Sequence, residues 1–197
     1  MLNGASWSAA LRSPSGTWGL AAVALTLVAL VLAAATVDVR SHRIPNRLVI
    51  AGALTGILFQ VVHAGFAGCL DALAGIAVGM GLFLPLYALR AMGAGDVKLM
   101  GMVGAFVGPG GAVAAVLFAC VAGGVLAIAV ALRNGQLGRL FWNLRMMLIG
   151  SFVGAVSGGG MEVVAPATSV GQLPYGVAIA AGTIAYLAMA CMGVSLV

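Results

Sequence analysis

Two aspartates, Asp38 and Asp96, are the residues of this sequence best suited to carry out a reaction. Each lies at the edge of a long apolar stretch, in a chain of 197 residues with only four acidic ones. An ionisable group at membrane depth indicates a functional site by default, because placing a charge there is costly. Two carboxylates that can meet suggest an aspartyl hydrolase dyad, in which one acid carries a proton and the other accepts one from water. This chemistry needs neither a metal nor a covalent intermediate.

The residues around the two aspartates favour this interpretation. The second aspartate follows Gly93 and Gly95, whose lack of side chains would let a substrate backbone approach closely. Lys98 lies two residues after it. The first aspartate is followed by a basic turn that ends at Pro45 and Asn46, and we expect this Pro-Asn pair to begin the next helix.

The composition predicts an all-α polytopic membrane protein. Hydrophobic residues make up 63% of the chain and charged residues 7%, whereas a soluble domain carries about 25% charged residues. We expect residues 1–197 to form a single domain. The net charge of +5 comes from arginines scattered beside apolar segments, which indicates membrane topology rather than nucleic-acid binding. The three cysteines are far apart and form no C-x-x-C pair, so we expect no zinc site and no other cofactor.

The apolar runs predict about six transmembrane helices. The first run, residues 18–37, is long enough to cross a bilayer core and longer than a signal-peptide core, so we expect it to be retained. An uncharged run over residues 99–132 is too long for one helix, and its Gly-Pro-Gly-Gly sequence at 108–111 should divide it. The expected helices span residues 18–37, 48–62, 70–89, 96–107, 112–132 and 174–196.

The positions of the basic residues predict the orientation. All nine Lys and Arg residues except Arg12 fall at alternate connections between these helices. By the positive-inside rule those connections are cytoplasmic, which places the amino terminus outside and both aspartates on the cytoplasmic side. Residues 133–173 form the longest connection. Its basic and aromatic segment, residues 139–148, is expected to be an amphipathic cytoplasmic helix between helices five and six.

Three motifs resemble those of the type IV prepilin leader peptidases, which are GxGD-type membrane aspartyl proteases. They are Asp38 with the His-Arg-Ile-Pro-Asn sequence at 42–46, the Gly-Ala-Gly-Asp-Val-Lys sequence at 93–98, and the late Leu-Pro-Tyr-Gly sequence within 173–180. The motifs occur in the family's order across nearly the whole chain, which looks most like the compact Flp/Tad-pilus branch.

The resemblance implies an endopeptidase of the bacterial inner membrane that removes the basic leader of prepilins at the cytoplasmic face. By resemblance, Asp38 and Asp96 are the catalytic pair. The residues that would bind substrate or support the motifs are Gly93, Gly95, Lys98, Pro45 and Asn46. The implied partners are a prepilin substrate and the lipid bilayer. The pilus assembly machinery stays open as a partner, as do the oligomeric state and methylation of the mature pilin, for which the sequence offers no residues.

The two acids are also compatible with three different roles. An ion- or proton-coupled transporter would place acids in its membrane helices as well. Simple interfacial ion pairs, Asp38 with Arg40 or Arg43 and Asp96 with Lys98, would need no catalysis at all. A protease with other substrates, similar to presenilin or signal peptide peptidase, would cut inside the apolar helix of its substrate.

Overall fold

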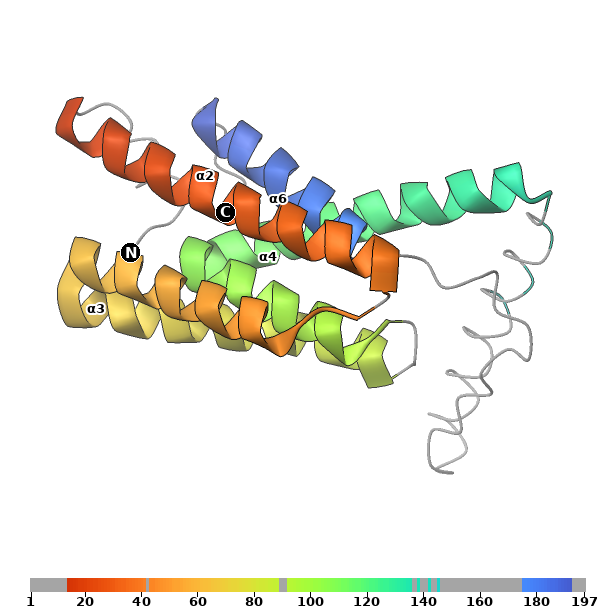
Figure 1. Cartoon of the computed structure of the whole chain (residues 1–197), viewed down its shortest axis with the longest axis horizontal. Helices are drawn as coiled ribbons and strands as arrows, with labels where there is room; N and C mark the ends of the chain where they lie inside the picture. Colours follow the sequence, from red (N-terminus) through yellow and green to blue (C-terminus); the bar gives the residue numbers. More distant parts are fainter. Residues whose placement is uncertain are drawn as a thin grey trace. The chain divides into compact units, whose positions relative to one another are not determined.

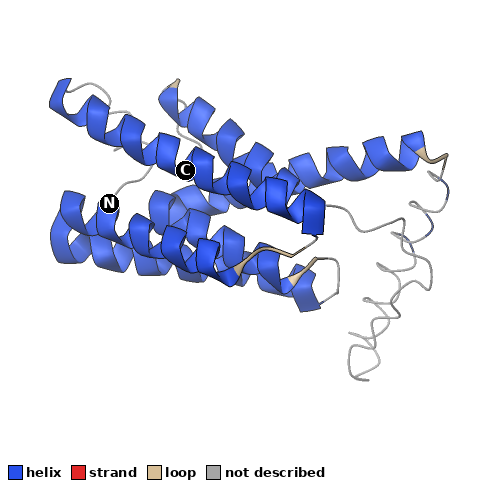
Figure 2. Ribbon diagram, in the orientation of Figure 1, coloured by secondary structure: helices blue, strands red, loops and turns tan. Residues whose placement is uncertain are grey.

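The chain is helical throughout the part that the structure describes. This computed structural model describes residues 14–41, 43–88 and 92–135, the single residues 138, 142 and 145, and residues 175–192. The helices are α2 (Pro14–Ser41), α3 (Asn46–Ala88), α4 (Ala94–Arg133) and α6 (Tyr175–Cys191), and these ranges hold no strand (Figures 1 and 2). The predicted all-α class is confirmed.

Three of these helices are long and apolar enough to cross a membrane. They are the stretch Ala21–Ser41 of α2, the 43-residue α3 and the 40-residue α4. The fourth, α6, is a shorter apolar helix of 17 residues. A bilayer core takes about 20 helical residues, so helices of this length and composition identify an integral membrane protein.

Helix α3 reverses its direction at Gly65. The backbone there has φ 60° and ψ −136°, a left-handed conformation that glycine adopts without steric cost. Gly52 and Gly79, one in each half of α3, contact α4 at Met102 and Met100. The first half of α3 runs in the same direction as the α4 segment that it contacts, and the second half runs in the opposite direction. The two halves are therefore antiparallel (Figure 1). The sequence led us to expect a longer connection at residues 63–69, but a single residue makes the turn.

Helix α4 reverses in the same way at Gly108, where φ is 71° and ψ is −178°. The break predicted within residues 108–111 is therefore confirmed, and the helix resumes at Pro109. A reversal leaves the last carbonyl groups of the preceding helix without helical partners. The buried side chain of Gln60 meets part of this need, since its Nε2 donates a hydrogen bond of 3.2 Å to the carbonyl oxygen of Phe106.

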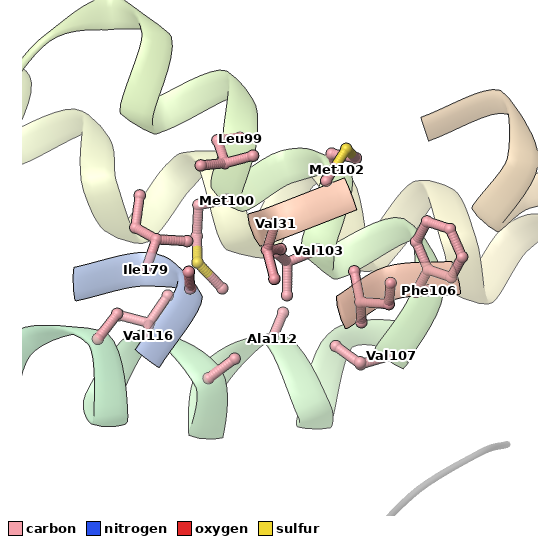
Figure 3. Close-up of a cluster of buried hydrophobic side chains, with 14 of the residues drawn as sticks. Val31, Leu99, Met100, Met102, Val103, Phe106, Val107, Ala112, Val116 and Ile179 are labelled. Atoms are coloured by element: carbon pink, nitrogen blue, oxygen red, sulfur yellow. The ribbon is translucent and has the colours of Figure 1, made fainter. Parts of the chain in front are cut away.

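The chain divides into two compact units. The first comprises Met1–Gly123 and Pro174–Val197, and the second comprises Gly124–Leu173. Within the first unit α2 packs along α6 and, over a shorter stretch, against α3. Its apolar core lies among α2, α4 and α6, and Figure 3 shows Val31, Met100, Val103, Ala112 and Ile179 meeting there. Of the second unit, the structure describes mainly the last part of α4, residues 124–133.

Small residues bring the helix backbones of the first unit together. Gly75 of α3 faces Gly104 of α4 so closely that a Cβ on either residue would overlap the carbonyl oxygen of the other. Gly182 of α6 approaches the backbone of Ala119 in the same manner. Membrane helices associate by this kind of close packing, because lipid offers no hydrophobic gain for bringing them together. These glycines of the first unit thus serve helix packing.

We expect the substitution Gly75→Ala to destabilise the protein by about 1–3 kcal/mol, because the added methyl group forces the α3 and α4 backbones apart. Gly81→Ala, in the same helix, is the matched control. A Cβ there meets nothing within 4 Å, and alanine favours a helix over glycine by roughly 0.5–1 kcal/mol. Thermal unfolding in detergent should show a lower Tm for the first variant and an equal or higher Tm for the second. Equal Tm changes would contradict the close approach.

Some predictions lie beyond what this structure tests. The amphipathic segment expected at residues 139–148 falls outside the described residues except for the isolated helical residues Trp142 and Arg145. His42 of the first motif also falls outside them. The single domain expected for residues 1–197 remains a prediction.

Candidate active site

Four helix ends meet at one end of the first unit. Asp38, one turn before the end of α2, bonds to Gly176 at the start of α6. Ile44, just before α3, packs against Gly95 in the first turn of α4. The motifs that the sequence singled out therefore converge, although they are spread from residue 38 to residue 176.

Asp38 is buried and held by a backbone amide of α6. The residue is only 7% exposed, and its Oδ2 accepts a hydrogen bond of 2.9 Å from the N–H of Gly176. The first amides of a helix have no helical acceptor, and the helix dipole favours negative charge at this end. Gly176 permits the contact by its lack of a side chain, since a Cβ there would lie 2.9 Å from Oδ2 and 3.0 Å from the Asp38 Cβ.

Asp96 is held in a similar way by the turn that precedes α4. It is 8% exposed, and its Oδ2 accepts a hydrogen bond of 3.0 Å from the N–H of Gly93. The N–H of Asp96 in turn donates to the carbonyl oxygen of Gly93 at 3.1 Å. This reciprocal pair of bonds closes the first turn of the helix and fixes the direction of the carboxylate.

The two carboxylates form a pair with matching support. The two acids are close enough for the charge of each to act on the other, and the charge of Asp96 also reaches Tyr175. Each aspartate uses Oδ2 for one backbone amide, and no hydrogen bond from the described residues reaches either Oδ1. Within the described ranges, each carboxylate therefore uses only one of its two oxygens for a hydrogen bond.

Ion pairing does not account for these acids in the part of the chain that the structure describes. Neither aspartate makes an ion pair with a described Lys or Arg side chain. Lys98, the partner of Asp96 in the alternative of a simple ion pair, instead donates a hydrogen bond of 3.1 Å to Oδ1 of Asn46. Two buried carboxylic acids at one end of the helices are the groups that an aspartyl dyad would use.

The predicted supporting residues link the loops around the pair. Gly95 lies against Ile44, and a Cβ there would come 3.3 Å from the Cβ of Ile44. The carbonyl oxygen of Pro45 accepts the N–H groups of Leu48 and Val49 at 3.1 and 3.4 Å, and α3 begins at Asn46 as predicted. These contacts tie the turn after α2 to the start of α4.

Two residues of the site were given no role by the sequence. The Pro-Tyr-Gly sequence at 174–176 belongs to the late motif, but nothing in its spacing indicated that Gly176 would bond to an aspartate 138 positions earlier. Tyr175 lies beside it, half-buried against the core and within reach of the charge of Asp96. A glycine in the first turn of an apolar helix was the one available signal, because that is where a buried acid finds free amides.

Fold and site together define a helical membrane protein with a pair of buried carboxylates at one end of its helices. Residues 25–128 match the model of the type IV leader peptidase family, and this range includes both aspartates. The chain belongs to that family. The resemblance noted from the motifs is therefore confirmed, and the family match gives no support to a transporter.

A relative in Myxococcus xanthus (strain DK1622), described as a prepilin leader peptidase/N-methyltransferase, is 32% identical over 145 residues. The alignment covers 70% of this chain and 43% of the relative, so the chain spans less than half of that protein's length. No solved structure matches the chain.

Proposed function

We propose that the protein is a membrane aspartyl endopeptidase that removes the basic leader of Flp-type type IV prepilins. The observation that carries this proposal is the buried Asp38–Asp96 pair, in which one oxygen of each carboxylate is held by a backbone amide. Membership of the type IV leader peptidase family supports the same activity, because the pair lies inside the matched residues.

The proposed mechanism uses the pair as general base and general acid. The ionised carboxylate accepts a proton from a water molecule as the water oxygen attacks the scissile carbonyl carbon. The protonated carboxyl group donates its proton to the carbonyl oxygen, which gives an uncharged tetrahedral diol. The diol collapses when the peptide C–N bond breaks and the leaving nitrogen takes a proton. Gly93 and Gly176 hold Oδ2 of the two aspartates, which leaves the Oδ1 atoms to face water and substrate.

The proposed topology has six membrane crossings, with the amino terminus outside and the aspartate pair at the cytoplasmic side of the inner membrane. The reversals at Gly65 and Gly108 support it, because each divides one long apolar helix into two antiparallel segments. The exposed basic residues Arg40, Arg43 and Arg47 lie at the end of the unit that holds the aspartates, as the positive-inside rule requires of a cytoplasmic end.

The proposed substrate is a prepilin whose basic leader precedes an apolar helix. The apolar helix would lie in the bilayer, and the leader would extend from it at the level of the pair. Contact with the pilus assembly machinery is part of the proposal, since the mature pilin must pass from this enzyme to a polymerising complex.

Co-expression with a Flp-type prepilin tests the activity. We expect the pilin to lose its leader only in cells that contain this protein, and the mass of the mature pilin reports both the cut site and any added methyl group. Cells that express the prepilin alone are the control. An unchanged prepilin mass would refute the activity, whereas a cut within the apolar helix would indicate a protease of the presenilin kind.

A further inference from the structure

An apolar groove opens on the first unit beside the candidate active site. It has a volume of about 230 Å³ and runs between the two halves of α3, over the first turns of α4. Its lining residues come from all three segments: Asn46, Val49, Ile50, Ala53, Ile76, Met80, Lys98, Gly101 and Met102.

The shape of the groove follows from the reversal of α3. Near the turn the two halves of α3 touch, and Gly68 lies directly on the backbone of Gln60. At the other end α4 separates them, since Gly52 of the first half meets Met102 and Met80 of the second half meets Gly101. The two halves therefore diverge around α4, and the groove fills the opening. Ile50 on its rim is 59% exposed, so the groove opens to the surface of the helices and hence to lipid.

The charge at the mouth of the groove has a single sign. Lys98 is the one charged residue of the lining, and it is exposed. Within the described part of the chain its hydrogen-bond partner is Asn46, so two of the three ammonium N–H donors remain for a ligand. Arg47, next to Asn46, is exposed and adds positive charge at this end. No acidic residue lines the groove.

We propose that this groove binds an acyl chain of an anionic phospholipid whose phosphate group contacts the Lys98 ammonium. Apolar walls fit the chain, and a basic pocket between membrane helices fits an anionic headgroup. Positive charge at the mouth attracts an anionic headgroup, so within this groove charge favours the lipid. The inference concerns a surface outside the aspartate pair and is independent of the reaction that the pair performs.

Photolabelling in lipid vesicles tests the proposal. The intact protein is placed in vesicles that contain phosphatidylglycerol and phosphatidylcholine in equal amounts with the same acyl chains, and in each experiment a trace of one of the two lipids carries a diazirine in its chain. Labelled peptides are then mapped by mass spectrometry. We expect labelling at Ile76, Met80 and Met102 to be about fivefold stronger with phosphatidylglycerol, the effect of one basic residue on an anionic lipid.

Variants separate the headgroup contact from the chain contact. Lys98→Met should abolish the preference for phosphatidylglycerol, and Lys98→Arg should keep it. Ala53→Phe fills the groove and should lower labelling by both lipids, whereas Ala51→Phe, at an exposed position outside the lining, should not. Equal labelling of the unaltered protein by the two lipids would overturn the proposal. This outcome does not depend on whether any variant folds. A preference for phosphatidylglycerol that survives Lys98→Met would also overturn it. So would crosslinking of the groove by the apolar segment of a prepilin in place of the lipid.

Discussion

Asn in place of Asp38 or of Asp96 is expected to lower the rate of leader removal by roughly 10²–10⁴-fold, the usual contribution of a general acid or base. An amide neither accepts a proton from water nor delivers one to the carbonyl oxygen. Because the two carboxylates act as one unit, the double variant should be scarcely worse than either single variant. The measurement is the rate of prepilin conversion by purified protein in detergent or vesicles.

Stability separates this loss of activity from a loss of fold. Asn keeps the shape of Asp, and its side-chain oxygen still accepts the N–H of Gly176 or Gly93. Asn also replaces a buried ionisable group by a neutral one, so neither variant should have a lower Tm. Asp71→Asn, in α3 and outside the site, is the control and should keep full activity. Normal cleavage by the Asp38 or Asp96 variant would rule out the dyad.

Gly176→Ala is the second variant with a large expected effect. The methyl group would lie 2.9 Å from Oδ2 and 3.2 Å from Cγ of Asp38, so the carboxylate or the start of α6 must shift. A displacement of about 1 Å at a catalytic group costs on the order of 10²-fold in rate. We therefore expect a loss of that size in kcat, while KM changes little, because Gly176 positions the aspartate rather than the substrate.

Gly93→Ala provides the contrast at the other aspartate. A Cβ on Gly93 would lie 3.4 Å from Oδ2 of Asp96, at the edge of ordinary van der Waals contact. The hydrogen bond from the Gly93 amide can persist, so this variant should lose much less activity than Gly176→Ala. A larger loss from Gly93→Ala would show that the glycine before Asp96 acts on substrate rather than on the aspartate, and would contradict the role given to Gly176.

Much of the helical arrangement could be predicted from the sequence, because apolar composition and strong breakers are local signals. The run of glycines around Pro109 predicted the reversal in α4, and Pro45 predicted the start of α3. For the reversal in α3, the predicted connection was longer than the single residue that makes the turn. Nothing in the composition around Gly65 distinguishes a one-residue turn from a short loop, since the choice depends on how Gly68 packs against Gln60.

Only part of the site could be predicted from the sequence. Asp38 and Asp96 stand out because acids are rare in this chain and costly where they lie. The sequence left open an ion pair of Lys98 with Asp96, but Lys98 bonds to Asn46, since α4 directs its side chain toward the start of α3. The hydrogen bond between Gly176 and Asp38 could not be predicted from the sequence. It depends on the packing of α2 along α6, a contact between distant segments with no local signature.

The tightness of the turns at Gly65 and Gly108 has a consequence for where other molecules can meet this protein. Each turn reverses the chain with one left-handed residue. The turn at Gly65 lies among exposed residues, with Phe66 78% exposed, whereas Gly108 is buried, so the two turns offer different surfaces to another molecule. The described residues of the connections after α2 and before α4 lie beside the aspartates, and Gly65 and Gly108 end the helical segments that begin there. In the proposed topology, recognition of a prepilin and its cleavage therefore fall on the same face of the membrane, the one opposite these two turns.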